Sequence, residues 1–276
     1  MKFAICNEMF EGWPFEDVCN AVSKIGYSGI EIAPFTFSRP ISELSGQERT
    51  SIRHIAKDAG LSVVGFHWCL ANTTGLHLTS PDKTVRDRTA EYLTELINLC
   101  ADVGGEVLVF GSPKQRNLLP GVSAEQAHEY AIDVFRSIVP ALENRGVTLA
   151  LEPLSPTETD FVNTAAQAQE IIAEIGSPRF GLTLDVKAMS SESTPMEQII
   201  RENKGSLKHF HANDANLRGP GFGDTDFTPV AAALNEVNYD GWVSVEVFDF
   251  SPDPITIATK SIQYLREVFE TERSKL

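Results

Sequence analysis

The chain has 276 residues, and 23 Lys and Arg against 38 Asp and Glu give it a formal net charge of −15. Such a surface repels phosphate backbones, so we expect no nucleic-acid partner. No apolar run approaches the roughly 20 residues that a membrane helix needs, and the first residues lack the apolar core of a secretory signal, so we expect a cytoplasmic protein without a membrane partner.

The four cysteines form no C-x-x-C pair; they are Cys6, Cys19, Cys69 and Cys100. This spacing indicates neither a disulfide framework nor a thiolate metal knuckle. We therefore expect buried, reduced thiols, as is usual in the cytoplasm.

Short apolar runs and helical patterns alternate along the chain. The predicted strands are KFAIC from Lys2, GIEIAPF from Gly29, SVVGFHW from Ser62, EVLVFGS from Glu106, TLALEPL from Thr148, FGLTLDV from Phe180, LKHFHAND from Leu207 and WVSVEVF from Trp242. These runs are mostly continuous rather than alternating, which is typical of parallel strands that are covered on both faces.

The predicted helices lie between these runs and carry recognisable end signals. The first begins at Pro14 and ends near Gly26, and the longest central one begins with Ser123 as its cap and ends at Gly146. The other patterns are SGQERTSIRHIAKDAG, PDKTVRDRTAEYLTELINLCADVG, TAAQAQEIIAEIG, TPMEQIIRENKG, FTPVAAALNEVNYDG and PITIATKSIQYLREVFETERSKL.

Eight strand–helix units predict an α/β protein with a single (β/α)8 TIM barrel domain over residues 1–276. The alternative is a doubly wound open sheet. That fold usually has fewer strands and a glycine-rich phosphate turn after the first one, and CNEMFEGWP contains no G-x-G-x-x-G.

Polar side chains follow four consecutive predicted strands. Glu152, Asp185, His211 and Glu246 stand at the ends of LALE, LTLD, HFH and VSVE. Taken singly, such an acid is more often a helix cap or an ion-pair partner, and such a histidine a hydrogen-bonded core residue. All four are predicted at one barrel rim, where barrel active sites lie, and the three carboxylates would repel one another there unless a cation neutralised them. Three carboxylates and an imidazole suit Mn²⁺, Mg²⁺ or Co²⁺ better than structural zinc.

With LEPL, LTLDVKAM, HFHANDAN, GPGFGDTDF and VSVEVF, the whole chain resembles the xylose isomerase-like TIM barrels. It is most similar to their sugar isomerase/epimerase group, which includes ketose 3-epimerases and hydroxypyruvate isomerase. The resemblance implies that Glu152, Asp185, His211 and Glu246 hold one divalent ion, usually Mn²⁺, with Mg²⁺, Co²⁺ or Zn²⁺ as alternatives. It also implies that Glu152 and Glu246 act as the acid/base pair.

Substrate contacts are expected from four further residues. The resemblance implies one at Glu158, and at Arg218 with a local spacing shifted by one. His67 ends the third strand, and Asp214 follows His211 closely. A surface acid is the alternative for Glu158, and a structural histidine for His67.

Several other residues near the predicted site have a less specific interpretation. His209 shares a strand face with His211 and points either into the pocket or into the core. Glu8, Trp13, Phe66 and Trp68 are candidates for a pocket wall, although core packing is the commoner use of such residues.

The stretch after the sixth strand departs from the ketose 3-epimerase pattern. Those enzymes carry D-T-F-H-M there, with a His that contacts substrate, whereas this chain has DVKAM. Ala188 stands where that His would be, and Lys187 precedes it. The metal ligands are thus kept while a specificity residue differs, so the substrate stays open.

We therefore predict a metal-dependent isomerase or epimerase of a small carbohydrate that transfers a proton through an enediolate. The alternative is a dehydratase of a keto-polyol, similar to inosose dehydratases. An endonuclease IV-like repair enzyme, which needs many histidines, fits less well, because the chain has only six histidines and is acidic. A catalytically silent sugar-binding protein is a third alternative, which the absence of a tight Mn²⁺ site would favour. We expect the glycine-rich loop at 216–227 to help cover the substrate, and a homo-oligomer is compatible with the sequence.

Overall fold

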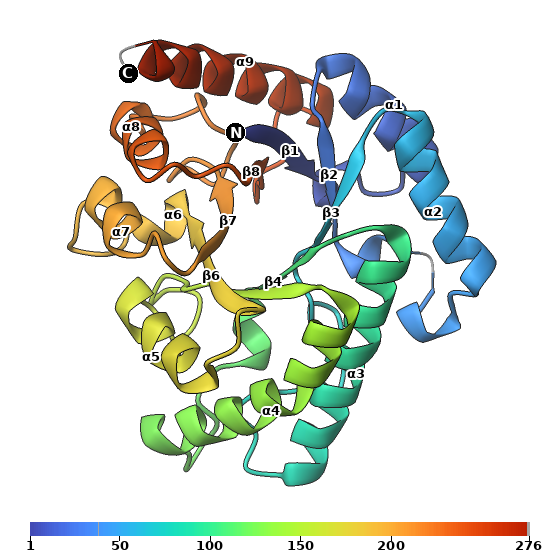
Figure 1. The fold of residues 1–276 in the computed structure, drawn as a ribbon, viewed down its shortest axis with the longest axis vertical. Helices are drawn as coiled ribbons and strands as arrows, with labels where there is room; N and C mark the ends of the chain where they lie inside the picture. The colour runs from blue at the N-terminus through green and yellow to red at the C-terminus, as the bar shows by residue number, and fades with distance from the viewer. Residues whose placement is uncertain (38, 275–276) are drawn as a thin grey trace.

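The computed structural model describes residues 1–37 and 39–274. In this part of the chain, parallel strands pair in chain order and the last pairs with the first, which closes a barrel (Figure 1). The strands are β1 (Lys2–Cys6), β2 (Gly29–Ile32), β3 (Ser62–Phe66), β4 (Val107–Phe110), β5 (Thr148–Leu151), β6 (Phe180–Asp185), β7 (Leu207–Ala212) and β8 (Trp242–Val245). The predicted TIM barrel is confirmed.

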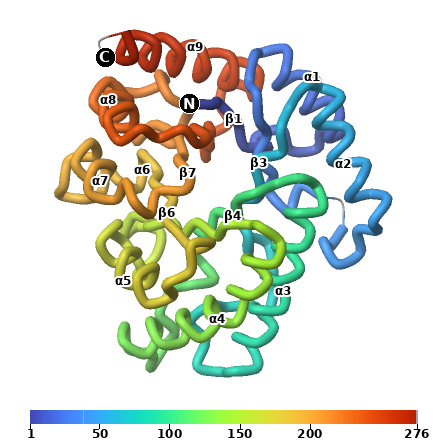
Figure 2. Tube along the Cα trace, in the orientation of Figure 1, coloured from blue at the N-terminus to red at the C-terminus, as the bar shows by residue number. Residues whose placement is uncertain are grey.

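Helices surround the strands, as the tube in Figure 2 also shows. They are α1 (Phe15–Ile25), α2 (Gly46–Asp58), α3 (Lys83–Val103), α4 (Ala124–Arg145), α5 (Ala165–Ile175), α6 (Val186–Met189), α7 (Met196–Glu202), α8 (Thr228–Glu236) and α9 (Pro254–Arg273). Helix α9 contacts both α8 and α1 and so completes the outer ring. None of the described helices is long and apolar enough to cross a membrane.

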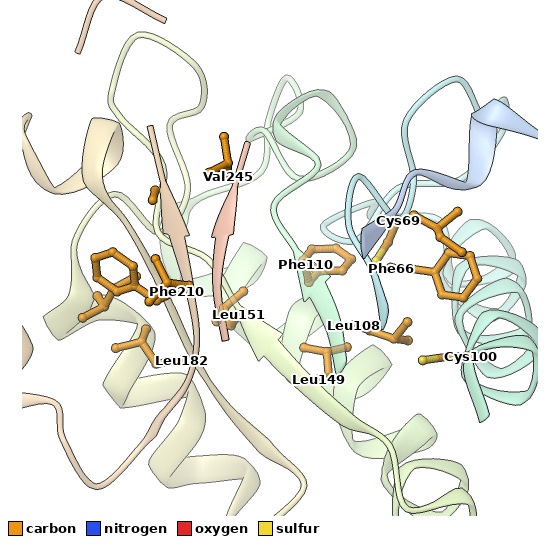
Figure 3. Packing of buried hydrophobic residues seen from close by; sticks show 14 of the residues in the cluster. Phe66, Cys69, Cys100, Leu108, Phe110, Leu149, Leu151, Leu182, Phe210 and Val245 are labelled. Carbon is orange, nitrogen blue, oxygen red and sulfur yellow. The ribbon is translucent and has the colours of Figure 1, made fainter. Parts of the chain in front are cut away.

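The core lies between the strands and these helices. Leu108 and Phe110 on β4 are paired with Leu149 and Leu151 on β5, and all four side chains are buried (Figure 3). The Phe110 ring packs edge-on against Phe135 of α4, with ring centroids 5.3 Å apart. Because residues two apart share one face of a strand, this alternation fixes which side chains face the helices and which face the barrel interior.

The helix ends follow the expected signals, and one short helix was not expected. The side chain of Ser123 accepts a hydrogen bond from the backbone of Gln126 and forms a capping box, and Gly146 ends α4 in the left-handed conformation. The short α6 was not predicted, because it has only four residues and immediately follows a strand. The predicted C-terminal helix is present as α9, and residues 275–276 lie outside the described residues.

Two neighbouring strands approach unusually closely at Gly65 of β3. A Cβ at this position would overlap the backbone carbonyl of Val107 on β4. Glycine is therefore required to close the barrel here. The carboxyl ends of all eight strands then meet at one rim, which is where the polar strand-end residues lie.

Candidate metal centre

The structure brings together the four residues expected to bind metal. Glu152 and Glu246 directly follow β5 and β8, Asp185 ends β6, and His211 lies near the end of β7. One ligand atom from each lies within 4.8 Å of the others, and each residue is at most 5% exposed.

The His211 ring shows which nitrogen faces the centre. Its Nδ1 lies 3.0 Å from Glu152 Oε1 and 3.1 Å from Glu246 Oε2, whereas Nε2 lies 3.2 Å from Glu31 Oε1. The charges of Glu246 and Glu31 outweigh burial and raise the pKa of His211 well above its usual range, so the ring is charged in the metal-free protein. Loss of the Nδ1 hydrogen would keep the Nε2 hydrogen on Glu31 and direct the Nδ1 lone pair at the centre. A carboxylate behind a ligating histidine is the usual way to fix its tautomer and orientation.

Asp185 is held from behind by two donors. Its Oδ1 accepts a 2.7 Å hydrogen bond from the backbone N–H of Ala188, and its Oδ2 accepts one from the side chain of Asn213. Burial, and then the charge of Glu152, raise the pKa of Asp185 to about 7. Burial also raises the pKa of Glu152.

Glu246 is the most acidic member of the group. Burial alone would raise its pKa, but the charge and hydrogen bond of His211 outweigh burial and lower the pKa to about 2. Trp68 Nε1 donates a 2.6 Å hydrogen bond to Glu246 Oε1. Three buried carboxylates with opposed pKa shifts around one imidazole nitrogen form a donor set that fits a hard divalent cation.

A cavity of about 260 Å³ opens beside this group. Glu152 and Glu246 line it, together with Glu158, Trp68 and Phe248. The indole of Trp68 stacks on Phe248 with ring centroids 6.0 Å apart. Trp68 has a φ of +51°, a conformation that costs a bulky residue on the order of 1–3 kcal/mol and is typical of functional sites.

Glu158 lies on the wall of this cavity and is tightly held. Lys187 Nζ donates a 2.6 Å hydrogen bond to its Oε1, and the hydroxyl of Ser155 donates a 2.8 Å hydrogen bond to its Oε2. The Lys187 ammonium also lies 3.9 Å from the centre of the Phe248 ring. The substrate contact expected of Glu158 stays a prediction, and the Lys187 ammonium lies beside this carboxylate.

The other three expected substrate contacts do not line the cavity. His67 is fully buried, and its Nε2 lies 3.0 Å from Glu8 Oε2. Asp214 accepts hydrogen bonds from the backbone of Gly223 and the hydroxyl of Thr225. Their substrate roles stay predictions.

Arg218 and the glycine-rich loop do not line the cavity beside Glu152 and Glu246. Arg218 Nε donates a 2.9 Å hydrogen bond to Asp249 Oδ2 at the surface. Loop residues 223–226 line a separate cavity of about 730 Å³ together with residues 189–197. Substrate contact by Arg218 and covering of the substrate by the loop therefore stay predictions.

Sequence reasoning missed two residues that hold the centre together. Glu31 is 1% exposed and contacts both His209 and His211, at 2.9 Å and 3.2 Å. Its signal was an acid inside the continuous apolar run GIEI. Arg116 is fully buried and donates to the backbone carbonyls of Glu152 and Val162. It lies in a loop, where the sequence gives no such signal.

Of the four residues considered for a pocket wall, one lines the cavity and another is a buried, hydrogen-bonded acid. Trp68 lines the cavity, and Glu8 is a buried acid whose Oε1 accepts a 3.2 Å hydrogen bond from the backbone N–H of Val247. Phe66 is core, and Trp13 is 43% exposed. His209 is fully buried and points toward Glu31.

Comparison with known proteins agrees with this geometry. A family model described as xylose isomerase-like TIM barrel matches residues 19–268. Among curated proteins, the chain is 26% identical to a D-psicose 3-epimerase of Agrobacterium fabrum over 82% of this chain and 77% of that protein. It is 23% identical to a probable ketose 3-epimerase of Synechocystis sp. over 95% of this chain and 92% of that protein. It is 28% identical to the 3-dehydro-D-guloside 4-epimerase of Escherichia coli over 64% of this chain and 70% of that protein.

Solved structures show the same fold. An L-ribulose 3-epimerase superposes with a TM-score of 0.86 at 21% identity, covering 99% of this chain and 96% of that one. A D-psicose 3-epimerase determined in the presence of D-fructose gives a TM-score of 0.81 at 23% identity, covering 99% of this chain and 97% of that one. Since the family model spans most of the sequence and the curated relatives are epimerases, the chain belongs to the xylose isomerase-like TIM barrel family and is an enzyme.

Proposed function

We propose that the protein is a divalent-metal-dependent epimerase of a small ketose or keto-sugar. Glu152, Asp185, His211 and Glu246 would hold the ion, with Mn²⁺ as the first candidate. The observation that carries the proposal is that two buried carboxylates from different strands, Glu152 and Glu246, line one small cavity and lie against the same imidazole nitrogen.

When bound, a divalent cation would polarise the substrate carbonyl and offset the negative charge that develops on the sugar oxygens. The protein supplies the proton transfers. One of Glu152 and Glu246 removes the proton from the carbon next to the carbonyl, which leaves an enediolate. The other returns a proton to the opposite face of that carbon, so the configuration inverts.

The surrounding residues keep these carboxylates in place and exclude water. The Trp68 indole N–H orients Glu246, while Arg116 holds the backbone carbonyl of Glu152. A Cβ at Gly111 would overlap Glu152 Oε2, so glycine leaves room for the carboxylate. The stacked rings of Trp68 and Phe248 form an apolar wall suited to the carbon face of a sugar.

The names of the relatives favour epimerisation over the alternatives, because they include 3-epimerases and a 4-epimerase. Isomerisation would need the proton to return to the neighbouring carbon, and dehydration would need a β-hydroxyl to leave. Both use the same first step, so the product distinguishes them.

The test is incubation of the Mn²⁺-loaded protein with a panel of ketoses, keto-sugars and inososes in D₂O. Epimerisation predicts one deuterium at the inverted carbon of the product, read by NMR. An aldose product would indicate an isomerase, and loss of water a dehydratase. Absence of exchange and conversion across the panel, with metal shown to be bound, would contradict the proposal.

A further inference from the structure

A second group of metal-ligand side chains lies entirely inside the barrel. Cys6 ends β1, Glu31 is in β2, and His67 directly follows β3. One potential ligand atom from each of the three lies within 4.8 Å of the others, and none of the residues is more than 1% exposed. None of them belongs to the set formed by the ends of β5 to β8.

The His67 ring leaves one nitrogen without a partner. Its Nε2 lies 3.0 Å from the carboxylate of Glu8, so the neutral ring carries its hydrogen on Nε2. Cys6 and Glu8 outweigh burial and raise the pKa of His67 well above its usual range in the ion-free protein. Its Nδ1 is buried and makes no hydrogen bond within the described residues. Glu31 Oε1 lies 3.9 Å from Nδ1, which is too far for a hydrogen bond.

The facing carboxylate is held by histidines on its other side. Glu31 Oε2 lies 2.9 Å from His209 Nε2, and Oε1 lies 3.2 Å from His211 Nε2. When His211 donates from Nε2 and directs Nδ1 at the rim, Glu31 accepts from both rings. The unpartnered Nδ1 of His67 and a buried carboxylate then face each other across 3.9 Å, and a cation between them would bind both once the ring has lost its Nδ1 hydrogen.

We propose that Cys6, Glu31 and His67 form a second, inner metal site that takes Zn²⁺. A thiolate, an imidazole and a carboxylate are zinc ligands, at about 2.3, 2.0 and 2.0 Å. In a tetrahedral arrangement such atoms lie about 3.3–3.8 Å apart, so the side chains need only a small contraction. The Glu8 carboxylate behind His67 completes the usual support of a zinc-bound histidine.

The charges of this inner site balance when the ion enters. Burial, and then the charge of Glu31, raise the pKa of the Cys6 thiol to about 11 in the absence of an ion. Coordination would release that proton to solvent, and the thiolate, the carboxylate and Zn²⁺ would sum to zero. Ser244, whose Oγ lies 3.5 Å from Cys6 Sγ, is available beside the fourth position.

The inner site differs from the rim centre in chemistry, and its residues contact His211 of the rim. The rim offers three carboxylates and an imidazole, whereas the inner group includes a sulfur, which favours a softer ion. Glu31 contacts His211 of the rim. An ion at the inner site would therefore stabilise the Glu31 position that orients His211, without touching the substrate.

The experiment titrates the metal-stripped, full-length protein with Co²⁺ and follows both bound metal and the near-ultraviolet absorption that a cobalt–thiolate bond produces. Two bound ions, one of them with the thiolate absorption, are expected. Asp185→Ala should keep the ion with the thiolate absorption, and Cys6→Ser should keep the other ion without it. Cys69→Ser, a fully buried cysteine outside the group, is the matched control and should behave as wild type.

X-ray absorption of the Zn²⁺-loaded wild type provides a readout that needs no variant. A sulfur neighbour at about 2.3 Å from zinc is expected. A single bound ion without sulfur coordination in the wild type would overturn the inner site, and so would thiolate absorption that persists in Cys6→Ser. Neither result bears on sugar epimerisation, so the inner site and the proposed function fail separately.

Discussion

The two halves of the barrel carry different kinds of polar residue. Strands β5 to β8 end in the four candidate ligands at the rim, two of which line the cavity, whereas β1 to β3 end in side chains that lie inside the barrel. The supporting set is Glu8, Glu31 and His67, with Trp68 beside them. Each half contacts the other, since Glu31 reaches His211 and Trp68 reaches Glu246.

Under the proposed function, this difference separates the residues that would carry out the chemistry from the residues that would position them. A buried carboxylate such as Glu31 fixes the tautomer of a ligand, and the strained backbone at Trp68 aims an N–H at Glu246. Substitution in the ligand half should therefore reduce the chemical step, and substitution in the supporting half should reduce metal affinity or positioning.

The largest effect is expected at the acid/base pair. Glu152→Gln and Glu246→Gln each keep an oxygen ligand but remove the base, so turnover should fall about 10²–10⁴-fold. Metal affinity should fall much less, which metal analysis of each variant checks. In an epimerase, each variant should still exchange the proton of one substrate epimer with D₂O. Near wild-type turnover in both variants would leave these carboxylates as ligands only.

A smaller effect is expected from Glu31→Gln in the supporting half. The variant keeps the size of the side chain but loses the charge that orients His211, so affinity for Mn²⁺ should fall about 10–100-fold. Electron paramagnetic resonance of free Mn²⁺ measures this directly. Glu158→Gln is the matched control, because Glu158 lines the cavity without contacting His211. Equal affinities for wild type and Glu31→Gln would remove Glu31 from the metal centre.

Metal affinity should also depend on pH in a defined direction. Burial and Glu152 raise the Asp185 pKa to about 7 in the metal-free protein, so below that pH a proton must leave before the carboxylate can bind an ion. The apparent affinity for Mn²⁺ should fall as the pH drops below 7, by about tenfold per pH unit for each proton displaced. Affinity that is constant through the acidic range would contradict the raised pKa.

The smallest effect is expected from Trp68→Phe. The ring can still stack on Phe248, but the hydrogen bond to Glu246 is lost, so turnover should fall about tenfold, the low end for a hydrogen bond to a charged group. Mn²⁺ affinity should change little. Trp13→Phe, at an exposed tryptophan, serves as the control and should leave the kinetics unchanged. A larger loss of metal than of turnover would place Trp68 among the residues that maintain the metal site.

The meeting of the four candidate ligands at one rim was predictable, because each of them ends an apolar strand. Glu152, Asp185, His211 and Glu246 each terminate an apolar run, and parallel strands bring such ends to one rim. Glu31 could have been found as an acid inside an apolar strand. Arg116 could not, because its loop gives no sign that the guanidinium is buried against the backbone of β5.

The sequence by itself determined the alternation of strands and helices, the closed barrel and the strand-end positions of the four candidate ligands, because hydrophobic periodicity and strand polarity are local properties of the chain. Only the tertiary structure decided which nitrogen of His211 faces the centre, that Lys187 pairs with Glu158, and that Cys6 and Glu31 meet His67. These contacts join strands and loops far apart in the chain. Their geometry depends on barrel closure and side-chain packing, which no local pattern encodes.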